Sequence, residues 1–204
     1  MKRTDDVAVR DALKQATAQL HTQAETCMPI ARPSPSMADY RDHLLVMLDW
    51  LGRLKQIDAD ADAADGLVES LAQDLEICEG ILRGTPRAPA TWVAVLTGHV
   101  LGRQPPCKSA LATLNASQWG VAYVLQGSRL GNQVMYRRLH ESLAPHPLAY
   151  LRGAGGDTGR DWTRFLQQLS AAVRTPQDVA LACAGAVTAF GLLLEILTPS
   201  EARF

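Results

Sequence analysis

Four polar residues near the start of the chain could act together chemically, because their spacing aligns them. Lys14, Thr17, His21 and Glu25 recur every three or four residues within the segment 11–27, and this period places them in one line along a helix. Glu25 lies one turn beyond His21, so its carboxylate can accept a hydrogen bond from one ring nitrogen and leave the other nitrogen to bind a metal. Lys14 would then suit the anionic edge of a flat metal-containing cofactor. The alternative is an ordinary surface His–Glu pair, which contributes only about 0.3–0.5 kcal/mol.

A second stretch, 118–139, combines helical periodicity with two interior glycines, Gly127 and Gly131. Each glycine inside a helix costs about 1 kcal/mol relative to alanine, so some other interaction should offset that cost. A backbone without side chains can approach a flat ligand closely or let the helix bend over it. The alternative is that a Gly-xxx-Gly pattern packs against another helix.

The remaining segments must position these two stretches, and they also show helical periodicity. Helices are predicted at 36–57, 67–82, 108–115 and 159–174, with a last helix that begins at Thr175. Ser36 with Asp39 and Thr175 with Asp178 have the spacing of capping boxes. The segment 58–66 is interpreted as a solvated connection and 145–156 as a mobile loop rich in glycine and proline, and 91–106 is assigned to no element.

No segment alternates convincingly between apolar and polar residues, so the sequence predicts an all-α fold in one domain, 1–204. The first helix should bury one apolar face, and the last should be buried in the core rather than anchored in a membrane, because its apolar run, 179–194, is short for a span. The predicted apolar face of the first helix consists of Leu13, Ala16, Leu20, Ala24 and Cys27.

Composition excludes a general electrostatic attraction to nucleic acid, because the formal net charge is -1. The scattered cysteines have no zinc-type spacing, and we expect reduced, mostly buried thiols in a cytoplasmic protein. The other histidines are expected to be surface residues or hydrogen-bonded interior ones. The cysteines are Cys27, Cys78, Cys107 and Cys183, and these histidines are His43, His99, His140 and His146.

Together the two stretches resemble the heme oxygenase family, especially its bacterial, phytochrome-associated branch. LKQATAQLH at 13–21 is similar to the family pattern LKxATxxxH, and YVLQGSRLGN at 123–132 is similar to YVxEGSxLGG. The resemblance implies an all-α, heme oxygenase-like multi-helical bundle. It also implies O2-dependent opening of heme to biliverdin, with release of CO and ferrous iron, so that heme is both substrate and cofactor.

The family pattern also implies roles for individual residues. His21 would be the axial iron ligand, Glu25 would orient its ring, and Lys14 would bind a heme propionate. The catalytic distal face and the rest of the heme-binding set would comprise Thr17, Tyr123, Gly127, Ser128, Gly131 and Asn132.

The chain departs from the family pattern at two positions. Gln126 replaces a glutamate and Asn132 replaces a glycine. Gln126 removes a charge that could affect the distal water network, and Asn132 would add bulk near the heme edge if it faces inward. The second propionate anchor is fixed by no motif, and Arg129, Arg160 and Arg164 are candidates.

The resemblance leaves three functions open. A heme oxygenase would need electrons from an external reductase or ferredoxin, because no flavin or nicotinamide motif is present, and it could pass biliverdin to a bacteriophytochrome. A heme-binding or heme-sensing protein would share the fold without opening the ring. A thiaminase-like enzyme on the same scaffold would need a reactive cysteine, and no cysteine in the sequence has an obvious activating neighbour.

Overall fold

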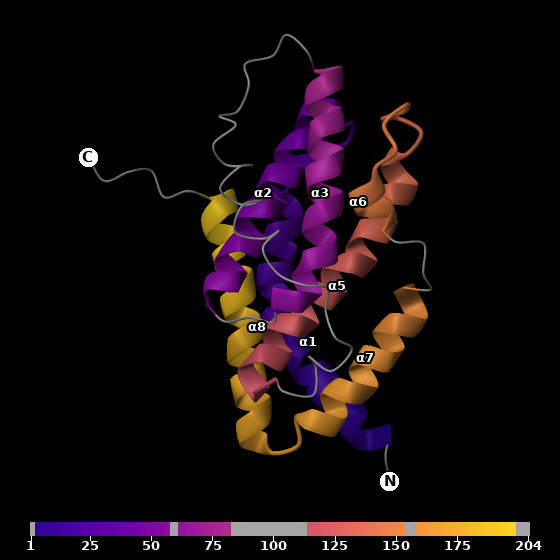
Figure 1. Cartoon of the computed structure of the whole chain (residues 1–204). Coiled ribbons are helices and arrows are strands. Elements are labelled where there is room, and N and C mark those ends of the chain that lie inside the picture. Colours follow the sequence, from indigo (N-terminus) through magenta and orange to yellow (C-terminus); the bar gives the residue numbers. More distant parts are fainter. Residues whose placement is uncertain (1–2, 58–60, 83–113, 154–157, 199–204) are drawn as a thin grey trace, which may run out of the picture.

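The computed structural model describes residues 3–57, 61–82, 114–153 and 158–198, with side chains described from Ala8 in the first range and Leu67 in the second. These ranges contain helices and no strand, which confirms the all-α prediction for the described part of the chain (Figure 1). The elements are α1 (Arg3–Cys27), the 3-10 helix η1 (Pro29–Ala31), α2 (Met37–Gln56), α3 (Ala61–Ile81), α5 (Ala116–Leu139), α6 (Ala149–Arg152), α7 (Thr158–Ala172) and α8 (Pro176–Leu197). The unassigned segment 91–106, the predicted helix up to residue 113, His99 and Cys107 lie outside the described residues.

Local capping signals set several helix starts. The capping boxes predicted at Ser36 and Thr175 are both formed, and Asn115 forms a third at the start of α5. The solvated connection predicted at 58–66 is wrong from Ala61 onward, because α3 begins there. Its alanines have high helix propensity, and acidic residues are favourable in the first turn of a helix.

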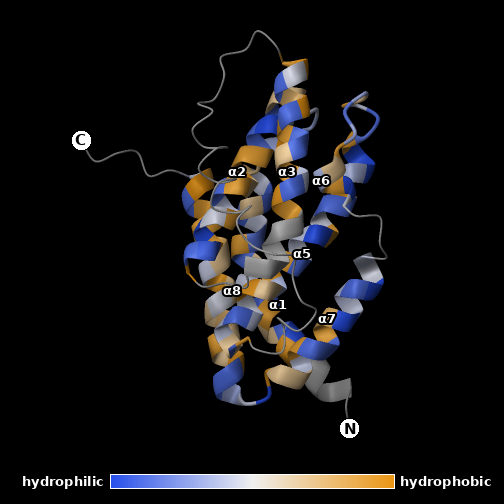
Figure 2. Ribbon diagram, viewed as in Figure 1, coloured by the Kyte–Doolittle hydropathy of each residue, from blue (hydrophilic) through white to orange (hydrophobic). Residues whose placement is uncertain are grey.

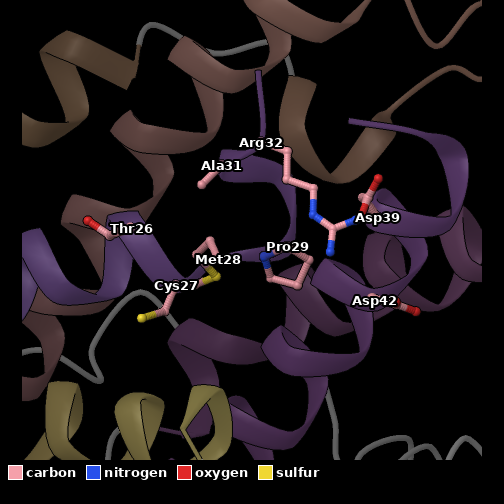
Figure 3. A pocket seen from close by; sticks show the side chains of 8 residues that line it. All are labelled: Thr26, Cys27, Met28, Pro29, Ala31, Arg32, Asp39 and Asp42. Atoms are coloured by element: carbon pink, nitrogen blue, oxygen red, sulfur yellow. The ribbon is translucent and has the colours of Figure 1, made fainter. Parts of the chain in front are cut away.

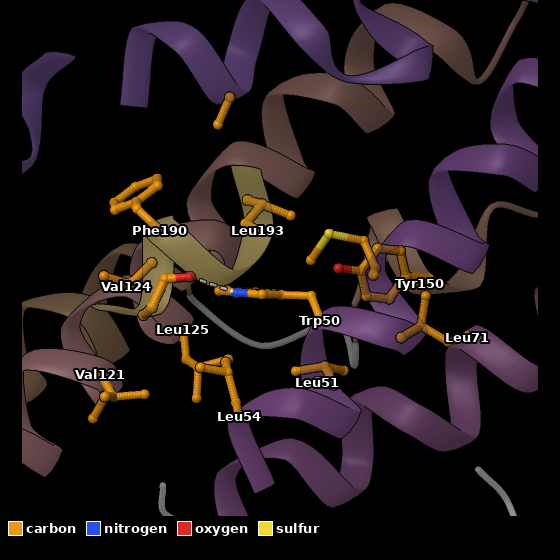
Figure 4. Close-up of a cluster of buried hydrophobic side chains, with 14 of the residues drawn as sticks. Trp50, Leu51, Leu54, Leu71, Val121, Val124, Leu125, Tyr150, Phe190 and Leu193 are labelled. Carbon is orange, nitrogen blue, oxygen red and sulfur yellow. Dashed lines mark hydrogen bonds between the residues drawn. The ribbon is translucent and has the colours of Figure 1, made fainter. Parts of the chain in front are cut away.

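The helices pack around α8, which lies along α1 and α5 and also contacts α2. Each helix carries both apolar and polar residues along its length (Figure 2). Trp50 of α2 lies in the core near Phe190 and Leu193 of α8, and its indole nitrogen donates a hydrogen bond of 2.8 Å to the Ala189 carbonyl (Figure 4). One side of the last helix therefore contributes to the core, so the prediction that this helix is buried holds for that side.

Much of the α8 surface is nevertheless apolar and not buried. Among the described residues, α8 is the one helix long and apolar enough to span a membrane, with 33% of its most apolar 18-residue window buried. Leu181 and Val187 are exposed, whereas Ala182, Ala186 and Ala189 are fully buried against neighbouring helices.

The α5–α8 crossing depends on two glycines. A Cβ added at Gly120 would lie 1.8 Å from the Ala182 carbonyl oxygen, and one added at Gly185 would lie 2.0 Å from the Ser117 carbonyl oxygen. The two backbones therefore touch directly at this crossing, because neither glycine interposes a side chain.

The segment predicted as a mobile loop at 145–156 contains a buried helical turn, α6, so that interpretation is wrong for residues 149–152. The fully buried Asp74 carboxylate accepts hydrogen bonds from the backbone N–H groups of Ala149 (3.0 Å) and Tyr150 (2.8 Å) and from the Tyr40 hydroxyl (2.6 Å). Burial and this carboxylate raise the pKa of Tyr40, so the hydroxyl remains a donor. Asp74 thus fixes α6 against α2 and α3.

Candidate functional site

α1 and α5 run in the same direction along α8. At one end, Tyr123 of α5 lies close enough to Arg10 and Asp11 of α1 for their charges to act on its pKa, which burial raises. At the other end, the Arg138 guanidinium of α5 donates to the carbonyls of Arg32 and Pro33, just after α1. These two connections fix the relative direction of the helices that carry the predicted site residues.

His21 and Gly131 each lie between those two connections along their own helix. A helix rises by about 1.5 Å per residue, so His21 is about 16 Å beyond Arg10 and Gly131 is about 12 Å beyond Tyr123. Tyr123, Gly127 and Gly131 follow each other at four-residue steps and share one face of α5. α7 contacts both α1 and α5 at the end of the bundle that carries the N-terminus (Figure 1).

The His21 side chain is accessible and its ring is held from two sides. It is 58% exposed, its Nδ1 lies 3.4 Å from Oε2 of Glu25, and Glu25 is 65% exposed. The edge of its ring meets Phe190 of α8, with 5.7 Å between ring centroids and an interplanar angle of 63°. This geometry turns Nδ1 toward the carboxylate and leaves Nε2 available as a ligand.

The rest of the predicted α1 site divides between surface and core. Lys14 is exposed, whereas Thr17 is buried and its hydroxyl donates to the Leu13 carbonyl at 2.8 Å. Thr17 therefore belongs to the inner face of α1. Ala16 and Cys27 are exposed, so the predicted apolar face is wrong at those two positions.

The two central glycines of α5, Gly127 and Gly131, have almost no described atoms close to the position that a Cβ would take. A Cβ at Gly127 would only touch the Trp162 ring at 4.0 Å, and one at Gly131 would find no described atom within 4 Å. The Gly-xxx-Gly alternative, in which another helix packs on this pair, therefore has no support among the described residues. Gly80, near the end of α3, and Gly191, directly after Phe190, are open in the same way.

Aromatic residues lie next to the glycine face of α5, which is the face shared by Tyr123, Gly127 and Gly131. Tyr123 lies against Trp162 of α7, with 5.4 Å between ring centroids, and Trp162 stacks on Phe165 at 5.7 Å. The Ser128 hydroxyl donates to the Leu125 carbonyl at 2.8 Å. Sequence reasoning missed the contact between Phe190 and His21, because Phe190 lies in a continuous apolar run where no pattern distinguishes it from core residues.

The two departures from the family pattern have defined surroundings. Asn132 is buried, and its amide lies near the Tyr150 hydroxyl of α6, whose pKa burial raises to about 12 against the opposing effects of Asn132 and Arg129. Gln126 accepts a 3.4 Å hydrogen bond from Arg129. Burial lowers the pKa of Arg129, which also lies near Asp161. Asn132 therefore points toward α6 and away from the face that carries Gly131.

These side chains fit a heme. An accessible imidazole with one oriented nitrogen suits an axial iron ligand, and the open glycines and neighbouring aromatic rings suit a flat apolar macrocycle. The exposed Lys14 ammonium suits a propionate. No cluster of three His, Cys, Asp or Glu side chains that could hold a metal ion occurs in the described part of the chain, but heme iron needs only one such ligand from the protein.

A second cluster, around Cys78, is structural. His146 Nδ1 accepts the Leu148 backbone N–H at 3.0 Å, so the ring proton is on Nε2, which lies 3.1 Å from the Asp74 carbonyl and 3.4 Å from Cys78 Sγ. The protonated Nε2 cannot bind a metal. Burial and nearby carboxylates raise the pKa of Cys78 to about 12, so the thiol is not a nucleophile at neutral pH. His146 is thus a hydrogen-bonded interior histidine, as predicted.

Two surface hollows in the described part of the chain include neither His21 nor the α5 glycines in their linings. One, of about 370 Å³, lies between the end of α1 and the start of α2 and contains the 2.7 Å Arg32–Asp39 ion pair (Figure 3). The other, of about 410 Å³, lies on α7 and includes Arg160 and Arg164, two of the proposed propionate anchors. The residues lining the first hollow are Thr26, Cys27, Met28, Pro29, Ala31, Arg32, Asp39 and Asp42.

No protein-family model matches this chain, and a search of curated proteins finds no significant match.

Proposed function

We propose that the protein is a heme oxygenase that binds heme between α1 and α5 and opens it to biliverdin, releasing CO and ferrous iron. The observation that supports this best is the pair of interior glycines, Gly127 and Gly131, which no packing contact among the described residues requires, on a helix that runs in the same direction as the one carrying the accessible His21. A bound flat ligand would account for the otherwise unfavourable glycines.

The α1 residues hold and orient the ligand. His21 would hold the heme iron through Nε2, while Glu25 beside Nδ1 would keep the ring turned and make it a better ligand. Phe190 supports the ring from α8. Lys14 would bind one propionate, and Arg129, Arg160 and Arg164 are the candidates for the other.

The α5 residues shape the opposite side of the ligand. When bound, the heme supplies the oxidation chemistry, including activation of O2 by its iron. Gly127 and Gly131 keep bulky side chains away from that side and leave room for O2 and ordered water, which can donate protons. Tyr123 and Trp162 exclude solvent from one end. The Ser128 hydroxyl is engaged with the helix backbone, so any role it has comes through its backbone position.

The reaction requires partners. Because the sequence has no flavin or nicotinamide motif, the electrons come from an external reductase or ferredoxin. Biliverdin then passes to an acceptor such as a bacteriophytochrome. Both steps belong to the cytoplasm in this proposal, with no membrane or nucleic acid involved.

Titration with hemin, followed by ascorbate under air, tests the proposal. The wild-type protein should give a Soret band that saturates at one heme per chain and then decays into the broad red absorbance of biliverdin. His21→Ala should lose the normal Soret band and the decay, while His140→Ala, which alters another exposed histidine, should behave like the wild type. A His21→Ala variant with a normal spectrum and normal ring opening would refute the proposal.

A heme-binding or heme-sensing protein is the second candidate. Gln126 favours it, because an amide bonded to Arg129 stands where the family pattern has a carboxylate. This function predicts a Soret band that saturates but never decays under the same conditions. Absence of heme binding would exclude both candidates.

A further inference from the structure

A buried polar cluster lies behind the glycine face of α5. It is formed by His43 of α2, Asn132 of α5 and Tyr150 of α6, all of which are buried. The His43 and Tyr150 rings have centroids 6.1 Å apart and are tilted by 47°. Among the described residues, neither of the His43 ring nitrogens nor the Tyr150 hydroxyl makes a hydrogen bond of normal geometry, although the Asn132 amide lies close enough to the hydroxyl to lower its pKa as a hydrogen-bond donor.

This arrangement contradicts the prediction that His43 would be either exposed or hydrogen-bonded. Nearby groups are already engaged, since the Tyr40 hydroxyl, on the turn of α2 before His43, donates to Asp74. Buried polar atoms are almost always hydrogen-bonded, and an unpartnered one reduces stability. Three such atoms on two neighbouring side chains therefore indicate a shared polar ligand.

The available groups define the chemistry of that ligand. Neutral imidazole has one donor and one acceptor, the tyrosine hydroxyl can do both, and the nearby Asn132 amide adds donors and an acceptor. Burial lowers the pKa of His43 to about 4, so the imidazole is neutral at physiological pH. A small neutral molecule that both donates and accepts hydrogen bonds matches this set.

We propose that His43, Tyr150 and Asn132 form an internal site for ordered water that bridges α2, α5 and α6. Asn132 directly follows Gly131 in α5. Hydrogen bonds to the Asn132 side chain therefore hold α5 in the rotation that keeps Gly131 accessible. Asn132 is then a positioning residue. This inference does not depend on heme binding.

High-resolution crystal structures of the full chain and of Tyr150→Phe test the site directly. The wild type should show a water at about 3 Å from both a His43 ring nitrogen and the Tyr150 hydroxyl, and Tyr150→Phe should displace or lose it. Three results would overturn the proposal: no density there, density larger than water, or a direct His43–Tyr150 hydrogen bond.

Thermal unfolding provides a second test at about pH 8, where histidine is neutral. If His43 and Tyr150 share a water, Tyr150→Phe should lower the unfolding midpoint less in the His43→Leu background than in the wild type. Tyr136→Phe, one turn beyond Asn132 and stacked on His140, is the control and should act additively with His43→Leu. Additive effects of His43→Leu and Tyr150→Phe would refute the shared site. If His43→Leu does not fold, Asn132→Ala replaces it in the same cycle.

Discussion

Helix α5 uses glycine in two different ways within twelve residues. At Gly120 the helix touches α8 so closely that an added Cβ would lie 1.8 Å from the Ala182 carbonyl oxygen, whereas at Gly131 an added Cβ would meet no described atom within 4 Å. The fold thus explains the first glycine completely. No contact among the described residues explains the second, which costs helix stability without improving the packing of those residues.

Residues that serve the fold differ in their surroundings from residues that are available to a ligand. Gly120 and Gly185 allow two backbones to meet, and Asp74 satisfies three buried donors. By contrast, His21 on α1 leaves an imidazole nitrogen accessible, and Gly131 on α5 leaves a stretch of backbone accessible. Substitutions of the packed residues should therefore change folding stability more than substitutions of the accessible ones.

Gly120→Ala should cause the largest loss, about 3 kcal/mol in the free energy of unfolding, because the new methyl group meets backbone that cannot rotate away. Urea denaturation measures this loss. Gly185→Ala should cost a similar amount. A change smaller than about 0.5 kcal/mol for both variants would mean that α5 and α8 do not cross through these glycines.

Acidic pH should destabilise the protein through His43, on the buried side of α5. Burial lowers the folded-state pKa of His43 from 6.5 to about 4, so below pH 6.5 the unfolded chain binds a proton that the folded protein excludes. The stability that depends on a neutral His43 is complete above pH 6.5 and is lost as the pH falls toward 4. The free energy of unfolding should decrease by about 3 kcal/mol in total.

The pH dependence can be assigned by substitution. Chemical denaturation of the wild type and of His43→Leu between pH 7 and pH 4 should show a shallower decline for the variant. Identical slopes would mean that His43 is protonated in the folded protein or is exposed to solvent.

Gly131→Ala should have the opposite effect on stability from Gly120→Ala. The apo-protein should gain up to about 1 kcal/mol, because alanine favours the helix and nothing obstructs its methyl group. Heme should still saturate at one per chain, but ring opening should slow by about 100-fold, because the methyl group would displace reactants from the distal face. Gly191→Ala is the control, since Gly191 is equally open but lies on α8. Unchanged ring opening would remove Gly131 from the proposed site.

Glu25→Gln should have the smallest effect on folding, below about 0.5 kcal/mol, because the His21–Glu25 pair is largely exposed. Its effect on heme affinity should be larger, about tenfold, since the carboxylate orients the ligating ring. Parallel urea and hemin titrations separate the two effects. Equal heme affinity in the variant and the wild type would show that Glu25 does not orient His21 for heme binding.

The sequence by itself determined the features that depend on neighbours three or four residues away. The capping boxes at Ser36 and Thr175 form as predicted, and so does the helix that continues through Gly127 and Gly131, because backbone hydrogen bonds and caps are local. The lines of residues that include His21 with Glu25 and Gly127 with Gly131 follow from helical periodicity alone. These local features carry the proposed heme-binding motifs.

Only the tertiary structure decided which side of each helix is accessible and which distant groups meet. Thr17 shares a predicted line with His21 but is buried, because α1 turns that side toward the core. Asn132 faces Tyr150, and the buried ring nitrogens of His43 have no hydrogen-bond partner among the described residues. Asp74 fixes a helical turn in the segment that was predicted to be a mobile loop. These contacts join residues that are far apart in the chain, and their geometry depends on how whole helices pack, which local periodicity does not encode.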